Sequence, residues 1–137
     1  MKYLYMLILV LFIFGCGSKA GLVATRELPS SAQAGSAFTV TINVDLDEGG
    51  SEAVAVEETL PIGCSLSGSS INSMDETTPT WIFDNADLPL PTNPRADTTF
   101  TYNIVCDNAG TLTFSGQISM ESAGSRSIGG DKTISIS

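Results

Sequence analysis

The sequence contains no histidine among its 137 residues. Its absence excludes Ser-His-Asp and Cys-His catalytic groups and removes the commonest transition-metal ligand. Basic side chains are also few, since 6 lysines and arginines stand against 15 aspartates and glutamates, for a net charge of −9. Such a surface repels phosphate backbones and anionic headgroups, so we expect no nucleic-acid partner. Helical periodicity is missing too, because no stretch after residue 21 keeps apolar residues at i, i+3 and i+4 through three turns.

The N-terminal segment is the one dense apolar run. Lys2 is followed by "YLYMLILVLFIF" (3–14), which as a helix would cover about 18 Å, short of the roughly 20 residues that span a bilayer. A positive start, an apolar core and then a small residue are typical of a secretory signal. No stop-transfer segment follows downstream, which disfavours a conventional transmembrane protein.

The end of this run carries a more specific pattern. The residues "IFGC" (13–16) resemble the bacterial lipobox, in which the cysteine becomes the lipidated N-terminus. The resemblance implies a signal peptide over 1–15, a lipid on Cys16, and a flexible tether over 16–21 that attaches the chain to a membrane. Gly17, by resemblance to Gram-negative lipoproteins, favours the outer membrane or cell surface. Plain secretion and an uncleaved anchor are the two alternatives.

The remaining chain, 22–137, shows a period of two, which is typical of strands with one buried and one wet face. Three runs carry it most clearly: 36–46, 98–106 and 110–121. Their apolar positions, expected to face inward, are Phe38, Val40, Ile42, Val44, Leu46, Phe100, Tyr102, Ile104, Cys106, Leu112, Phe114, Ile118 and Met120. These faces predict an antiparallel, all-β core.

Shorter candidate strands fill the gaps, at 22–28, 53–60, 65–71, 80–83 and 132–137, and turn-forming residues separate them. About eight strands in one chain of this length predict a single Ig-like antiparallel β-sandwich. We expect Trp81 and Phe83 in its core; a platform for a cofactor or a sugar at Trp81 is the alternative. Pro89, Pro91 and Pro94 exclude a central strand around them.

Two cysteines besides Cys16 remain in the exported domain, and an even pair in an oxidising compartment usually forms a disulfide. Cys106 continues an inward face, and Cys64 follows the "LPIG" turn. We therefore favour a Cys64–Cys106 disulfide over two buried thiols. A disulfide that closes the loop from residue 64 to residue 106 stabilises the fold by about 4 kcal/mol in the chain-entropy model.

Two groups of acidic residues are candidates for chemistry. Asp45, Asp47, Glu48 and Glu52 could offer oxygen ligands to calcium, although their spacing is not that of an EF-hand and a solvated hairpin turn is the simpler interpretation. Glu58 falls in phase with the apolar residues Val54, Val56 and Leu60. We expect a bulge or a sheet edge to expose its carboxylate; a buried carboxylate with a raised pKa is the alternative.

Several phrases along the chain resemble a module of secreted bacterial surface proteins. They are "TRELPSSAQAGSAFTVTINV" (25–44), "VEETLPIG" (56–63), "FTYNIVCDNAGTLTFSGQIS" (100–119) and "IGGDKTISI" (128–136). The resemblance implies an Ig-like or cohesin-like sandwich that acts as a spacer, adhesion or protein-binding unit. Its signatures are strands and turns, so they specify fold better than activity.

The sequence thus favours a lipid-anchored cell-envelope module with a non-catalytic binding or structural role and no resident cofactor. We expect its partners to be an envelope protein or a surface glycan, in addition to the membrane. Two alternatives stay open: a calcium-dependent adhesion module that uses 45–52, and a small hydrolase with paired carboxylates.

Overall fold

The computed structural model describes residues 22–46, 53–83, 92–94, 99–120 and 124–137, and these residues form strands, turns and bends without a helix. Thirteen strands are present in this part of the chain: β1 (Leu22–Glu27), β2 (Ser31–Ala32), β3 (Ala37–Leu46), β4 (Val54–Thr59), β5 (Cys64–Ser69), β6 (Thr80–Phe83), β7 (Thr92–Asn93), β8 (Thr99–Cys106), β9 (Gly110–Thr113), β10 (Ser115–Met120), β11 (Gly124–Ser127), β12 (Gly129–Gly130) and β13 (Thr133–Ile136). The predicted all-β sandwich is confirmed.

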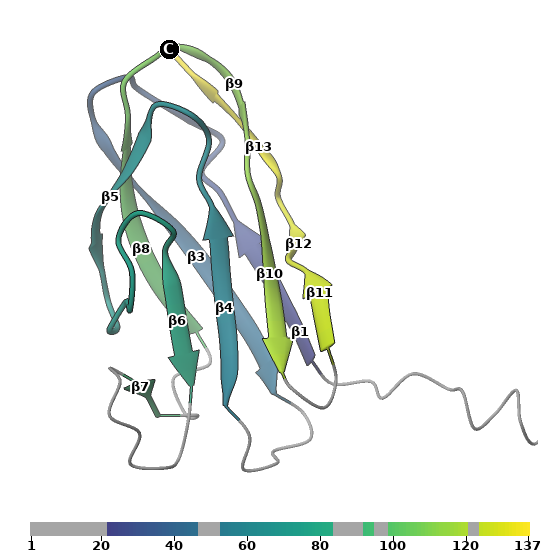
Figure 1. The fold of residues 1–137 in the computed structure, drawn as a ribbon. Coiled ribbons are helices and arrows are strands. Elements are labelled where there is room, and N and C mark those ends of the chain that lie inside the picture. The colour runs from purple at the N-terminus through teal and green to yellow at the C-terminus, as the bar shows by residue number, and fades with distance from the viewer. Residues whose placement is uncertain (1–21, 47–52, 84–91, 95–98, 121–123) are drawn as a thin grey trace, which may run out of the picture.

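Two five-stranded sheets face each other and a small third sheet joins them at one end (Figure 1). The first sheet has the order β12-β1-β3-β8-β5, the second β11-β10-β4-β6-β7, and the third β2-β13-β9. Most neighbours are antiparallel, and the parallel pairs are β1 with β12, β2 with β13, and β6 with β7.

All eight strands expected from the sequence are present, but the described chain holds thirteen rather than about eight. The run 110–121 divides at Phe114, because β9 pairs with β13 in the third sheet while β10 pairs with β4 in the second. The strands β2, β7, β11 and β12 were not expected; each is short and lies at an edge of its sheet. The position of β7 agrees with the exclusion of a central strand by the neighbouring prolines.

The segment 124–137 contributes to all three sheets in turn. β11 pairs with β10 in the second sheet, β12 with β1 in the first, and β13 with β9 and β2 in the third. Ile128 lies at the first crossing, where it is buried and its N–H donates to the Gly116 carbonyl at 3.0 Å. The C-terminal segment therefore fastens the layers together along one side.

The core fills the space between the two large sheets. Its buried apolar residues are Ala24, Phe38, Val40, Ile42, Val44, Val54, Val56, Trp81, Phe83, Phe100, Tyr102, Ile104, Cys106, Phe114, Ile118, Ile128, Ile134 and Ile136. The faces predicted for 100–106 and for Phe38 to Val44 are confirmed, while Leu112 and Met120 are only partly buried.

Trp81 and Phe83 lie in this core, as predicted. The Trp81 ring packs against Phe100 at 4.8 Å and against Tyr102 at 5.1 Å between centroids, so β6 of one sheet contacts β8 of the other. The Trp81 indole N–H donates to Ser69 Oγ at 2.9 Å. Because the side chain is fully buried, it presents no platform to a cofactor or a sugar, and that alternative is wrong.

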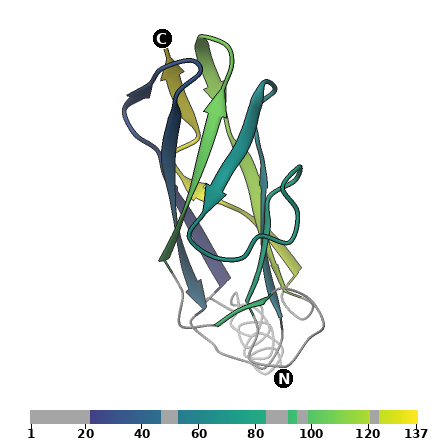
Figure 2. The ribbon, with the colours of Figure 1, turned by 90° about the vertical axis from the view of Figure 1, so that its left-hand side faces the viewer.

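The strand β1 begins at one end of the sandwich, and residue 137 lies at the other. β1 begins at the lower end in Figure 1, whereas the chain terminates at Ser137 at the upper end, and the view turned by 90° agrees (Figure 2). The connections from β4 to β5 and from β8 to β9 also lie at the upper end. We call this upper end, formed by residues 33–36, 60–63, 107–109 and Ser137, the far end.

Candidate functional site

The far end is built from three loops that the backbone holds together. Gly35 N–H donates to the carbonyl of Cys106, and Asp107 N–H donates to the carbonyl of Gly63, both at 2.9 Å. Ala34 N–H donates to the carbonyl of Ser137, also at 2.9 Å. Each loop is thus hydrogen-bonded to a neighbouring segment, and these bonds hold the far end in a defined conformation.

The predicted disulfide is present where β5 and β8 meet the far end. Cys64 and Cys106 lie directly opposite each other in the register of β5 and β8, with an S–S distance of 2.08 Å and a Cα–Cα distance of 4.0 Å. Cys106 is buried, as its place on the inward face of β8 predicts. The bond joins the edge strand of the first sheet to its neighbour at the point where both reach the far end.

The loop before Cys64 forms a tight turn that displays an isoleucine. Cys64 N–H donates to the carbonyl of Pro61 at 3.1 Å, and Gly63 at the third position has a φ of +85°. A positive φ there is the signature of a type II turn, which favours glycine. Ile62, at the second position, is 98% exposed. The strand pattern gave no reason to single it out; the available signal was an isoleucine between a proline and a glycine.

The prediction that a bulge or a sheet edge exposes the Glu58 carboxylate is wrong. Glu58 is fully buried between the two sheets, where Arg26 of β1 donates from Nε to Oε1 at 2.8 Å and from Nη2 to Oε2 at 2.7 Å. The two charges therefore neutralise each other inside the core. Arg26 was missed in the sequence, although it keeps the phase of Ala24, which also faces inward.

The surroundings of the pair explain how the charges are accommodated. Arg26 Nη1 donates to the carbonyl of Asp131 at 2.9 Å, and its guanidinium carbon lies 5.5 Å from the centre of the Phe114 ring. Gly116, opposite Glu58 in the register of β10 and β4, leaves room for the carboxylate, since a Cβ there would lie 2.8 Å from Oε2. The Asp131 carbonyl, the Phe114 ring and Gly116 of β10 thus enclose the pair.

Burial raises the pKa of Glu58, and the hydrogen bonds and charge of Arg26 oppose this shift. Tyr102 lies close by, and burial together with the negative charge of Glu58 raises the pKa of its hydroxyl strongly. Within the described residues the Tyr102 hydroxyl has no hydrogen-bond partner at ordinary distance. Because neither charged side chain is exposed, the pair has no surface on which a ligand could bind, and it acts on the stability and geometry of the sandwich.

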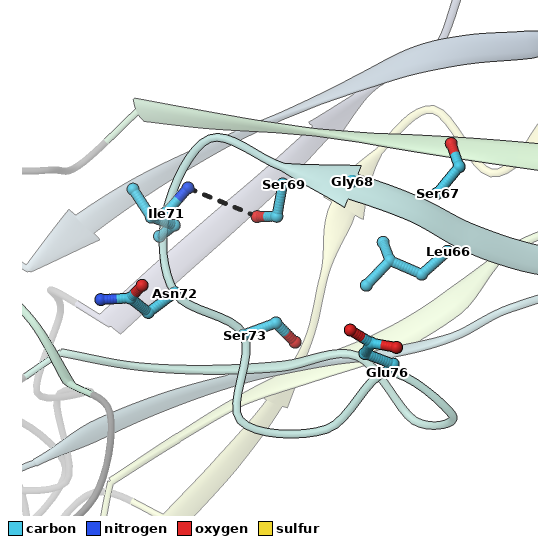
Figure 3. A pocket seen from close by; sticks show the side chains of 8 residues that line it. All are labelled: Leu66, Ser67, Gly68, Ser69, Ile71, Asn72, Ser73 and Glu76. Atoms are coloured by element: carbon cyan, nitrogen blue, oxygen red, sulfur yellow. Dashed lines mark hydrogen bonds between the residues drawn. The ribbon is translucent and has the colours of Figure 1, made fainter.

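A shallow polar pocket lies along β5 and the loop that follows it (Figure 3). Its volume is about 360 Å³, and its lining residues are Leu66, Ser67, Gly68, Ser69, Ile71, Asn72, Ser73 and Glu76. A register shift between Leu66 and Gly68 bends the edge strand here. The Ser69 hydroxyl accepts from Ile71 N–H as well as from the Trp81 indole, so its position is fixed from within.

Most of the predicted functional residues lie outside the described part of the chain. These are Cys16 with the leader and tether, and Asp47, Glu48 and Glu52 of the calcium hypothesis. Asp45 ends the outward face of β3 and is exposed. Among the residues described, no three metal-binding side chains come together, and no helix could cross a membrane. The lipid and calcium predictions therefore stay predictions.

No family model matches the chain. A protein of Archaeoglobus fulgidus described as "Uncharacterized protein" is 29% identical over 138 aligned residues. The similarity covers 100% of this chain and 79% of that protein, so it extends through the apolar run 3–14 as well as the sandwich.

Proposed function

We propose that the protein is a lipid-anchored module of the cell envelope, in which an Ig-like sandwich has a non-catalytic binding or structural role. Cys16 would carry the lipid, and residues 17–21 would connect it to β1. One observation carries the proposal: β1 begins at the end of the sandwich opposite the disulfide-linked far end. An anchor before β1 would therefore leave the far end at the greatest distance from the attachment point, where partners in the envelope or at the cell surface can reach it.

The disulfide supports export, because such bonds persist in oxidising compartments outside the cytoplasm. Attachment through the acidic surface itself is disfavoured, since a net charge of −9 repels anionic headgroups. A lipid supplies the missing attraction at about 0.8 kcal/mol for each buried methylene, and two acyl chains make the attachment stable. The expected partners are an envelope protein or a surface glycan, contacted at the far end.

The experiment is to fractionate cells that express the full chain with Cys16→Ser, with Ser18→Ala as the matched control in the tether. The Cys16→Ser protein should leave the membrane fraction, while the control should remain there through a high-salt wash. The intact mass of the control should show a chain that begins at Cys16, carries acyl groups, and lacks two hydrogens at the disulfide. Equal retention of both variants, or a mature mass without acyl groups, would remove the anchor from the proposal.

A further inference from the structure

We propose that Ile62 is the anchor side chain by which the far end binds a protein partner, inserting into an apolar pocket that has a basic group at its rim. The proposal rests on the far end being within reach of partners, as proposed above. It concerns one turn, 61–64, together with the neighbouring Asp107.

Ile62 is the most exposed large apolar side chain in the described part of the chain. It is 98% exposed, whereas Val23 and Met74, the other exposed large apolar residues there, are each at 43%. The folded domain gains no burial energy from an isoleucine at this position. A partner that buried it would gain about 1.5–3 kcal/mol, which is the size of a typical interface hot spot.

The turn holds this side chain in one place before any partner arrives. The Cys64–Pro61 hydrogen bond closes the turn, Gly63 supplies the positive φ, and the disulfide fixes the next residue to β8. Gly63 is also clamped from the side, because its carbonyl accepts from Asp107 N–H. Binding would therefore cost little conformational entropy at the turn, which is the main advantage of a preorganised contact.

The chemistry of the far end favours a protein over a lipid bilayer. A single isoleucine contributes less than a myristoyl chain, which alone gives only weak, reversible membrane binding. Asp107 is exposed beside the turn, and its charge would face anionic headgroups unfavourably. A protein pocket avoids both problems, since it encloses the side chain and can place a lysine or an arginine against the carboxylate.

A second copy of the chain is a poorer occupant on the same grounds. The pocket along β5 is lined mainly by serine, asparagine and glutamate side chains, which would have to give up water to receive an isoleucine. Basic groups are scarce as well, with 6 in the whole sequence against 15 acidic ones. The partner should therefore be a different protein with a basic surface.

The test begins with a photo-crosslinking amino acid placed at position 62 of the full chain in its own cells, and at position 23 as a comparison. Crosslinked proteins specific to position 62 are identified by mass spectrometry. The identified protein is then purified, and its Kd for the mature chain is measured against variants. Ile62→Ser should weaken binding at least about tenfold, Ile62→Leu less than about threefold, and Val23→Ser not measurably.

A fourth variant, Asp107→Asn, should weaken binding and flatten its dependence on salt, because it removes the charge that faces the basic rim. The melting temperature of each variant reports whether the fold is intact. The proposal is overturned if position 62 yields no specific protein crosslink, crosslinks only lipid or another copy of the chain, or if Ile62→Ser binds as well as the unchanged protein. Membrane retention of each variant is recorded separately, so a failure of the lipid anchor is distinguishable from a failure of this contact.

Discussion

Removing either partner of the Arg26–Glu58 pair should destabilise the fold, but the two removals should differ in their response to pH. Both side chains are fully buried, and two hydrogen bonds of 2.8 and 2.7 Å join them. Leaving one charge of such a pair alone in the core costs about 3–5 kcal/mol. The two variants differ in whether the remaining group can become neutral by gaining or losing a proton.

In Arg26→Met the remaining Glu58 can take up a proton. Burial already raises the pKa of Glu58 above its usual value of 4.5, and removing Arg26 takes away the interactions that oppose this shift. A folded-state pKa above the unfolded value means that stability is present at low pH and is lost as pH rises. The free energy of unfolding of Arg26→Met should therefore fall by up to about 1.4 kcal/mol per pH unit above pH 4.5.

In Glu58→Gln the remaining guanidinium keeps its charge wherever the protein is folded. Its cost should be nearly constant across the same pH range, and the unchanged protein should show a slope between those of the two variants. The double variant Arg26→Met with Glu58→Leu removes both charges and should lie within a few kcal/mol of the unchanged protein, on either side.

Urea denaturation followed by circular dichroism, repeated from about pH 4.5 to pH 8, measures all four proteins. The reasoning is refuted if Arg26→Met and Glu58→Gln show parallel pH profiles. It is also refuted if the double variant loses as much stability as the two single variants together, because the charges would then not be coupled.

Three further predictions follow from the packing. Reducing the disulfide should lower the free energy of unfolding by up to about 4 kcal/mol, measured by urea denaturation with and without reductant; an unchanged midpoint would contradict this. Gly116→Ala should lower the free energy of unfolding by about 1–3 kcal/mol, because the added Cβ would lie 2.6 Å from the carbonyl oxygen of Glu57. A melting temperature equal to that of the unchanged protein would show that β10 and β4 can move apart without cost. Ser69→Ala should cost about 1–3 kcal/mol and shift the emission of Trp81, since the buried indole N–H would lose its acceptor; unaltered fluorescence would argue against the hydrogen bond.

Much of the sandwich was predictable because each long strand carries a strict period of two. The inward residues of β3 and β8, Cys106 among them, follow directly from that alternation. The choice of Cys64 as its partner came from the even pair of cysteines and not from the period. The aromatic core around Trp81 was predictable for the same reason. What the period could not give is the pairing of strands, and hence the short segments β2, β7, β11 and β12, whose existence depends on neighbours distant in sequence.

The buried pair shows the limit most clearly. The period places Glu58 and Arg26 on inward faces correctly, but the cost of burying a lone carboxylate argued for exposure of Glu58. That argument fails because the two residues, 32 positions apart, satisfy each other's charge. The candidate site was harder to predict still. The exposure of Ile62 depends on turn geometry and on the lack of a covering element among the described residues, and neither leaves a periodic signal.

The path of residues 124–137 bears on when the protein can mature. These last residues supply one strand to each sheet and bring the Asp131 carbonyl to Arg26, near the start of the domain. A nascent chain still lacking them has an open seam between its layers and a guanidinium without one of its acceptors. The sandwich can therefore close only after residues 124–137 have been synthesised and have left the ribosome, so its layers and its buried ion pair are completed together, late in synthesis.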